Sequence, residues 1–202
     1  MTQAPGVEPP QPPVVLASSS PRRRQLLEMM RIPHRVIAPD VDESLHRGEA
    51  PERYVVRLAH AKARAVAGRA PGELVIAADT TVVLDGELFA KPESPADAVR
   101  MLGRLQGRTH QVLTAVAVAR DERIEHALDV SQVTFRPADR ETLLGYVSTG
   151  EPLDKAGAYA IQGLGAMFIE RVEGDLFGVM GLPLRLVLDL LARFGRPYRF
   201  TR

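Results

Sequence analysis

Short apolar runs alternate along the chain with longer segments in which apolar residues recur at helical spacing. The short runs predict strands buried in a sheet, and the longer segments predict helices that begin, in most cases, at a proline. The predicted strands lie at 14–17, 34–38, 73–78, 109–119, 123–136 and 166–172. The predicted helices lie at 21–31, 51–67, 95–105, 138–148 and 183–193.

A hairpin is predicted directly after the strand at 73–78. That run ends at Asp79, and the following TVVLDGELFA has Asp85-Gly86 as a two-residue turn. A hairpin returns the chain to its starting end, so Asp79 and Lys91 are expected to be neighbours. Because hairpins interrupt the strand–helix alternation, the sequence predicts a single α/β domain with a mixed sheet over 14–202.

Length and composition exclude several kinds of site. The 202 residues suffice for one domain with a sizeable core. The absence of cysteine excludes disulfides, thiolate catalysis and Cys-based zinc sites, and the five histidines lack metal-ligand spacing. A net charge of +1 gives no basis for binding a nucleic acid polymer or a membrane surface. Any anionic ligand therefore needs a local site.

The first 13 residues differ in composition from the remainder. MTQAPGVEPPQPP contains five prolines, no basic residue and no apolar stretch. It predicts a disordered tail rather than a signal peptide. No apolar run is long enough to span a bilayer, so the expected location is the cytoplasm.

The segment LASSSPRRRQLL (16–27) has the features of an anion site. A strand and a serine-rich turn lead into a helix N-terminus, where free backbone N–H groups and the positive dipole end point at the turn. The hydroxyls of Ser18 and Ser20 add donors. Arginines at 22–24 oppose the helix dipole unless an anion lies among them. The alternative is a capped helix with a solvated basic face.

Carboxylates follow two of the predicted strands. Asp79 follows 73–78, and Glu43 lies in the acidic loop after 34–38. Ligand sites in α/β sheets form at the carboxyl ends of strands, and Mg²⁺ is held by one or two carboxylates with phosphate oxygens and waters. Glu43 and Asp79 are candidate metal ligands if the fold brings them together. The alternative is that Asp79 is a turn residue and that Glu43 lies in a solvated loop.

Lysine is rare in this chain. Lys62, Lys91 and Lys155 are the only lysines among 26 basic side chains. A lysine is a compact point charge that meets a phosphate oxygen end-on, whereas arginine is a planar fork. The three lysines are therefore candidates for phosphate contacts, with compositional bias as the alternative. Lys155 lies in GEPLDKAGAYAIQG (150–163), whose small residues allow a close approach to a ligand.

Several segments together resemble the Maf family of nucleoside triphosphate pyrophosphatases. They are ASSSPRR, the acidic DES, the lysine of AHAKA, AADT…KP, GRTHQVLTAVA, GEPLDKAGAYAIQG and VMGLPL, in order from Val14 to about Leu191. The resemblance implies an elongated α/β fold of the Maf/Ham1 (ITPase-like) type with a central cleft. It also implies hydrolysis of a nucleoside triphosphate to the monophosphate and pyrophosphate, with a divalent cation such as Mg²⁺ or Mn²⁺.

The resemblance assigns roles to single residues. Asp79 matches the family's general base, and Glu43 shares the metal and base roles with it. Positions that matter for substrate choice are matched by Arg22, Thr80 and Gln162. The remaining expected substrate contacts are Ser18, Ser20, Arg23, Lys62, Lys91 and Lys155.

The strings A-D-T-T and A-Y-A-I-Q-G resemble the dTTP/UTP branch of the family. A uracil or thymine edge presents acceptor, donor and acceptor, and the amide of Gln162 offers both a donor and an acceptor. Two alternatives stay open: a 7-methyl-GTP pyrophosphatase, whose cationic base favours an acidic partner, and a nucleotide-binding regulator of septum formation without hydrolysis. A homodimer also stays open.

Overall fold

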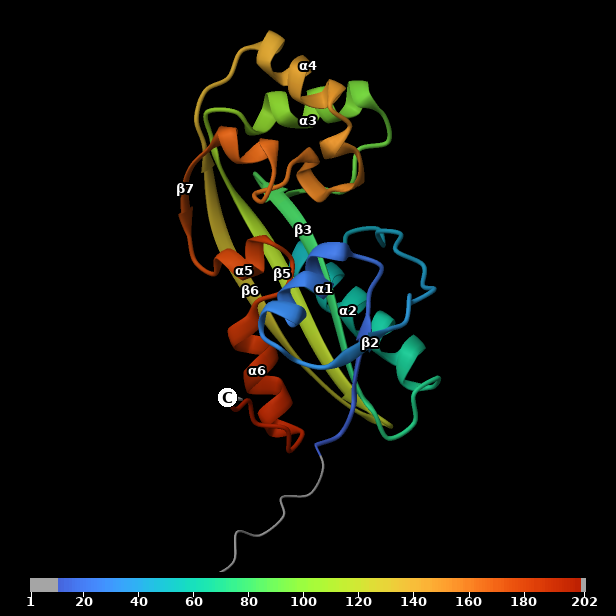
Figure 1. The fold of residues 1–202 in the computed structure, drawn as a ribbon. Helices are drawn as coiled ribbons and strands as arrows, with labels where there is room; N and C mark the ends of the chain where they lie inside the picture. The colour runs from blue at the N-terminus through green and yellow to red at the C-terminus, as the bar shows by residue number, and fades with distance from the viewer. Residues whose placement is uncertain (1–10, 201–202) are drawn as a thin grey trace, which may run out of the picture.

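One seven-stranded sheet runs through the computed structural model, which describes residues 11–200 (Figure 1). The strand order is β2-β1-β3-β5-β6-β7, and β4 pairs with β3. The strands are β1 (Val14–Ala17), β2 (His34–Val36), β3 (Leu74–Leu84), β4 (Glu87–Phe89), β5 (Thr109–Arg120), β6 (Arg123–Phe135) and β7 (Ile169–Glu173). Strand β1 pairs in parallel with β2 and β3, and the other pairs are antiparallel. The predicted mixed sheet is confirmed.

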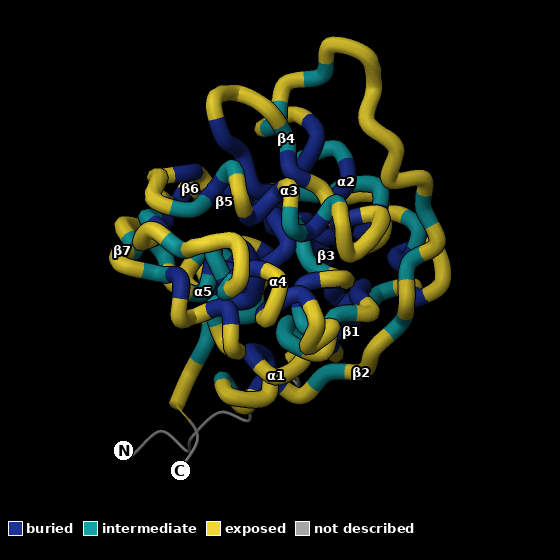
Figure 2. Tube along the Cα trace, turned by 90° about the horizontal axis from the view of Figure 1, so that it is seen from above, coloured by how far each residue is buried: buried dark blue, intermediate teal, exposed yellow. Residues whose placement is uncertain are grey.

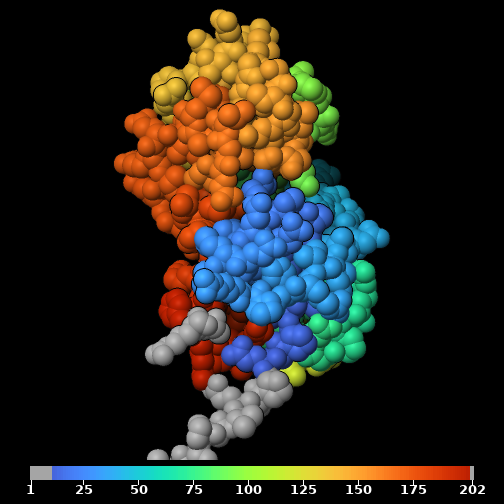
Figure 3. Space-filling model, viewed as in Figure 1, coloured from blue at the N-terminus to red at the C-terminus, as the bar shows by residue number. Residues whose placement is uncertain are grey.

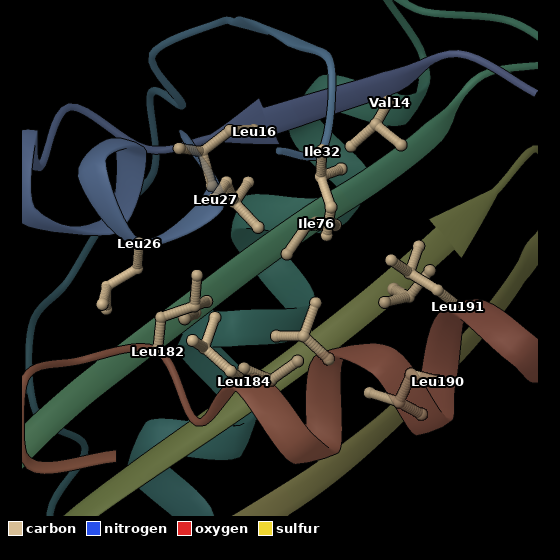
Figure 4. Packing of buried hydrophobic residues seen from close by; sticks show 14 of the residues in the cluster. Val14, Leu16, Leu26, Leu27, Ile32, Ile76, Leu182, Leu184, Leu190 and Leu191 are labelled. Carbon is tan, nitrogen blue, oxygen red and sulfur yellow. The ribbon is translucent and has the colours of Figure 1, made fainter. Parts of the chain in front are cut away.

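Helices cover both faces of this sheet. They are α1 (Pro21–Met29), α2 (Pro51–Ala67), α3 (Pro95–Leu105), α4 (Arg140–Ser148), α5 (Leu176–Val179) and α6 (Leu184–Arg193). Helix α2 packs on one face, while α1 and α6 pack on the other, where Leu27, Ile76 and Leu190 meet (Figure 4). Helices α3 and α4 cover the far end of the long strands (Figure 1).

The alternation of side chains along β3 explains how one strand serves three apolar clusters. Val75 and Ala77 point toward α2, Ile76 points toward α1 and α6, and Val82 packs below α3 and α4. Seen from above, the buried residues lie at the centre and the exposed loops surround them (Figure 2). Each fully buried Val, Leu or Ile side chain contributes about 1.5–3 kcal/mol of transfer free energy. The strand is thereby held firmly in place.

Strand β3 is longer than its sequence predicts. It continues past Asp79 to Leu84, so Asp79 lies near the middle of a strand and not at its carboxyl end. The reason is that the β-branched residues after Asp79 pair with β5 along the whole segment, as Thr81 pairs with Leu113. The predicted turn at Asp85-Gly86 is confirmed, and both of its residues have positive φ, at 54° and 79°.

Two other segments differ from prediction. The loop after α4 contains short 3₁₀ turns at Glu151–Asp154, Ala156–Ala158 and Leu164–Phe168, so the expected strand at 166–172 begins only at Ile169. The short helix α5 has no counterpart among the predicted elements. Ser20 precedes α1 as expected, but its side chain makes no capping hydrogen bond.

The predicted tail lies largely outside the described residues, which begin at Gln11. Within them, the Pro12 carbonyl accepts from Arg196 at 2.8 Å and the Pro13 carbonyl from the Leu74 N–H at 2.9 Å. No helix between residues 11 and 200 combines the length and apolar character needed to cross a membrane.

Candidate active site

A cavity of about 760 Å³ lies between the α1 region and the loop 150–168, which we call the rim loop. Figure 3 shows the blue surface of the first region and the orange surface of the second facing each other across this recess. The lining comes from the β1–α1 turn, α2, β3, the segment after β4, and the rim loop. Segments far apart in the sequence therefore meet around one space.

Most of the predicted site residues line this cavity. They are Ser18, Ser20, Arg22, Arg23, Glu43, Lys62, Asp79, Thr80, Lys91 and Lys155. Gln162 differs: it is exposed and is not part of the lining, although its neighbour Ile161 is. The structure thus gathers the candidates for phosphate binding and catalysis and leaves the candidate for base recognition on the outer side of the rim loop.

Lys62, Asp79 and Glu43 form the charged centre of the cavity. The Nζ atom of Lys62 lies 2.6 Å from Asp79 Oδ1 and 2.7 Å from Glu43 Oε1. The Lys62 and Asp79 side chains are only 7% and 8% exposed, whereas Glu43 is 48% exposed. Because an unpaired buried charge is costly, each of the two buried groups depends on the other. The expectation that Glu43 and Asp79 come together is confirmed.

The two carboxylates differ in basicity. Burial raises the pKa of Asp79, and the charges of Lys62 and Arg23 oppose that rise without cancelling it. Partial burial also acts to raise the pKa of Glu43, but the hydrogen bond and charge of Lys62 hold that pKa below its usual value. Asp79 is therefore a stronger base than an ordinary aspartate, and Glu43 is a weaker base than an ordinary glutamate.

The loop that carries Glu43 is held by α2. Tyr54 donates its hydroxyl hydrogen to the Glu43 carbonyl at 3.0 Å, and Arg57 donates to the Ser44 carbonyl at 2.9 Å and to the Glu49 carboxylate. The sequence placed Tyr54 on the apolar side of this helix. A hydroxyl on an otherwise apolar face was the one available signal for its role.

The three arginines at the start of α1 have different surroundings. Arg23 donates from Nε to the Gly181 carbonyl at 2.8 Å and from Nη2 to Thr80 Oγ1 at 3.1 Å. Burial lowers the pKa of its guanidinium, and the charge of Asp79 opposes that shift. Arg22 lines the cavity, and Arg24 is exposed and pairs with Glu28. The alternative of a solvated basic face describes Arg24 alone.

The serine turn is also organised around the cavity. Ser18 is buried, and its Oγ accepts from the Ser20 N–H at 3.1 Å. That bond holds the turn before α1, although Ser20 itself provides no side-chain cap. Ser19 is exposed and lines the same cavity.

Lys91 and Lys155 stand at the cavity edge. Lys91 is exposed, lines the same cavity as Asp79, and forms no ion pair with a described residue. Lys155 donates to the Glu151 carbonyl at 2.6 Å and pairs with Asp154. Lys91 therefore offers a free ammonium, whereas Lys155 is already engaged within the rim loop.

One carboxylate organises the rim loop. Glu151 accepts from the Tyr146 hydroxyl, the Leu164 N–H and the Gly165 N–H, each at 2.9 Å. These bonds hold the pKa of Glu151 below its usual value, although desolvation acts to raise it. A Cβ at Gly163 would overlap this carboxylate, so a side chain there would displace Glu151 from these bonds. Sequence reasoning missed Glu151, since an acid beside a glycine-rich loop is a common pattern.

The oxygen ligands of the cavity fit a hard divalent cation that also binds substrate. Glu43 and Asp79 supply two carboxylates. Thr81 also lines the cavity, and its buried Oγ1 atom has no hydrogen-bond partner among the described residues. Within residues 11–200, no cluster of three or more His, Asp or Glu side chains could hold a metal by itself. Mg²⁺ suits such an incomplete set, because phosphate oxygens and waters complete its coordination.

The chain is similar to a family model, to named relatives and to a solved structure. The family model described as Maf-like protein matches residues 13–194. A dTTP/UTP pyrophosphatase of Symbiobacterium thermophilum is 50% identical, with 91% of this chain and 95% of the relative covered. One of Myxococcus xanthus is 52% identical, with 91% and 93% covered, and one of Bacillus velezensis is 44% identical, with 90% and 96% covered. The solved structure of the Staphylococcus aureus Ham1 protein aligns with a TM-score of 0.48 at 19% identity, covering 90% of this chain and 96% of that one.

Proposed function

This chain belongs to the Maf family, and on that premise we propose that it hydrolyses dTTP and UTP to the nucleoside monophosphate and pyrophosphate. The observation that carries the proposal is the buried Asp79 held by Lys62 in a cavity lined by further cations. The choice of dTTP and UTP is supported by the names of relatives that share 44–52% of their residues with this chain.

The triphosphate binds where positive groups face the cavity. Arg22 and Lys91 present their charges to it, and the exposed part of the β1–α1 turn presents backbone N–H groups at a helix N-terminus. Lys91 meets phosphate oxygens most readily, since it forms no ion pair within residues 11–200. Arg23 also contributes positive charge, but its guanidinium is already hydrogen-bonded to Thr80.

Hydrolysis requires a water positioned opposite the leaving group. The water oxygen attacks the phosphorus of the α-phosphate. The bond between this phosphorus and the oxygen that leads to the β-phosphate breaks, and its electron pair leaves with pyrophosphate. Asp79 takes the proton that the water loses, and its raised pKa makes it a more effective base than an exposed aspartate. Lys62 keeps the Asp79 carboxylate ionised and correctly oriented.

Glu43 and Asp79 would hold a divalent cation, Mg²⁺ or Mn²⁺, between the protein and the phosphates. When bound, the cation offsets negative charge that develops on the phosphoryl oxygens. Glu43 is the more available of the two ligands, because it is half exposed and its carboxylate is stabilised as an anion.

We assign substrate choice to three residues, two in the lining of the cavity and one on the rim loop. Arg22 and Thr80 line the cavity. The amide of Gln162 lies one residue beyond Ile161, and we propose that it pairs with the pyrimidine edge at the rim.

A nucleotide panel tests the proposed function. Purified protein with Mg²⁺ is assayed for phosphate release in the presence of added inorganic pyrophosphatase, across dTTP, UTP, dCTP, GTP and 7-methyl-GTP. We expect dTTP and UTP to have the highest kcat/KM. A preference for 7-methyl-GTP, or binding of nucleotides without any turnover, would overturn the proposal in favour of one of its alternatives.

A further inference from the structure

A buried histidine contacts one of the residues that line the cavity. His110 of β5 is only 2% exposed, and its Nε2 atom lies 2.9 Å from the hydroxyl oxygen of Tyr159 in the rim loop. Tyr159 lines the cavity, whereas His110 does not. Any effect of His110 on a ligand therefore passes through Tyr159.

The imidazole of His110 has one hydrogen-bond partner among the described residues, the Tyr159 hydroxyl. Burial lowers the pKa of His110 to about 4, so the ring is neutral at physiological pH. Its second nitrogen, Nδ1, is buried without a partner within residues 11–200. A buried polar atom without a partner is destabilising, and an apolar ring at this position would avoid that cost. Packing alone therefore does not explain a histidine here, whereas its bond to Tyr159 does.

Aromatic packing holds the Tyr159 ring beside the same histidine. Edge-on contacts join the rings of Tyr159, His110 and Phe135, with the Tyr159 centroid 5.4 Å from that of His110 and 4.7 Å from that of Phe135. The chain before Tyr159 is pressed against β3, since a Cβ on Gly157 would lie 2.7 Å from the Val82 side chain. Packing thus fixes the Tyr159 ring, and the bond to His110 fixes its hydroxyl end.

The lining of the cavity around Tyr159 is apolar. Val82 and Val112 lie opposite each other on β3 and β5, and both line the cavity with Tyr159. Arg22 and Lys91, which we place at the triphosphate, lie on α1 and after β4 instead. Nucleobases stack on aromatic and apolar side chains. The apolar wall therefore suits the nucleoside end of the substrate.

We infer that His110 is a positioning residue, which holds Tyr159 as a fixed wall for the nucleoside and so acts on substrate affinity rather than on bond cleavage. The inference deepens the proposed function and rests on it. A wall that is fixed before the substrate arrives needs no ordering on binding, so loss of the bond weakens affinity. The step at phosphorus depends on Asp79, which is hydrogen-bonded to Lys62 and to neither of these residues.

Three single variants and one double variant separate the bond from the packing. His110→Phe keeps an aromatic ring without a hydrogen-bonding atom, and Tyr159→Phe removes only the hydroxyl. His110→Gln keeps a polar group and is the conservative control. For each variant, and for the double phenylalanine variant, kcat and KM are measured with dTTP. Inhibition by inorganic tripolyphosphate, a probe without a nucleoside, is measured in parallel, and thermal unfolding checks the fold.

We expect His110→Phe and Tyr159→Phe each to raise KM for dTTP about three- to tenfold, with kcat within about twofold of wild type. The double variant should not exceed the larger single effect, because both changes remove the same bond. His110→Gln should keep KM within about twofold of wild type. Inhibition by tripolyphosphate should be unchanged in every variant, since the phosphate end of the cavity is untouched.

Additive effects on KM in the double variant, a fall in kcat at unchanged KM, or an equal weakening of tripolyphosphate inhibition would overturn the inference. A wild-type KM in Tyr159→Phe would also overturn it, and this variant decides the question if His110→Phe does not fold. Failure of the proposed function is distinguished because wild-type protein would then not turn over dTTP.

Discussion

The floor of the cavity and its rim loop are built in different ways. The floor consists of Lys62 on α2 and residues Asp79 to Thr81 on β3, which are fixed by strand pairing, apolar packing and a buried ion pair. The rim loop has short 3₁₀ turns and depends on the carboxylate of Glu151. The proposed base therefore lies on a rigid strand, where geometry must be precise, whereas Gln162, the proposed contact to the nucleobase, lies on a loop.

The largest effect is expected from Asp79→Asn in the floor. Without a base to take the proton, kcat falls about 100- to 10,000-fold, whereas nucleotide affinity changes little. Single-turnover rates and nucleotide titration measure the two quantities. Asp85→Asn, in the exposed β3–β4 turn, is the matched control and should behave as wild type.

Asp79→Asn is also expected to change the stability of the fold. Burial raises the pKa of Asp79 in the folded state above its value in the unfolded state. The contribution of Asp79 to the free energy of unfolding therefore falls as the pH rises from the unfolded-state pKa to the folded-state pKa. At neutral pH the ionised side chain destabilises the fold. Asn carries no charge, and Lys62 keeps Glu43 as a partner. The Tm of Asp79→Asn at neutral pH should equal or exceed that of wild type. A clear drop would show that the ion pair stabilises the fold.

A smaller loss is expected from Lys62→Met. Removal of the ammonium takes away a charge-assisted hydrogen bond worth about 1.5–3 kcal/mol, which corresponds to a loss in kcat/KM of about 10- to 100-fold. Arg64→Met, on the exposed side of the same helix, is the control. Equal activity of the two variants would remove Lys62 from the mechanism.

A change in the rim loop is expected to affect binding more than chemistry. Glu151→Gln weakens the bonds to the Leu164 and Gly165 N–H groups, so KM should rise about tenfold while kcat stays within about threefold. Steady-state kinetics with dTTP provide the test, with Glu122→Gln in the exposed β5–β6 turn as control. A fall in kcat without a change in KM would contradict the division between floor and rim.

The smallest effect is expected from Gln162→Ala. An exposed amide contributes about 0.5–1.5 kcal/mol through one hydrogen bond, so kcat/KM for dTTP should fall about three- to tenfold with no change in Tm. Loss of activity with dTTP but not with dCTP supports contact with the base. No loss with either nucleotide would exclude Gln162 from recognition.

The floor and the rim also differed in how far the sequence predicted them. Apolar runs, and prolines at the starts of helices, predicted nearly all the strands and helices. The small number of lysines and the order of the motifs along the chain indicated Lys62, Asp79 and Glu43. The contact between Asp79 and Lys62 depends on α2 lying across β3, which no local pattern contains. The extension of β3 past Asp79 was missed because a polar residue in mid-strand was read as a strand end.

The rim loop could be predicted less well because its conformation depends on long-range polar contacts. Glu151 holds backbone groups 13 and 14 positions away, and the sequence alone does not pair an acid with such distant N–H groups. For the same reason the exposed position of Gln162 was not foreseen.

The role of Asp79 as a base held by Lys62 can be measured from the pH dependence of kcat/KM for dTTP in wild type and in Lys62→Met. Activity requires ionised Asp79, so it falls as pH drops through the Asp79 pKa, which burial raises and Lys62 lowers. Titration of the nucleotide is common to both proteins, so a shift between the two profiles belongs to the enzyme. We predict that the acid limb moves to higher pH in Lys62→Met. An acid limb at the same pH in both proteins would contradict Asp79 as the base held by Lys62.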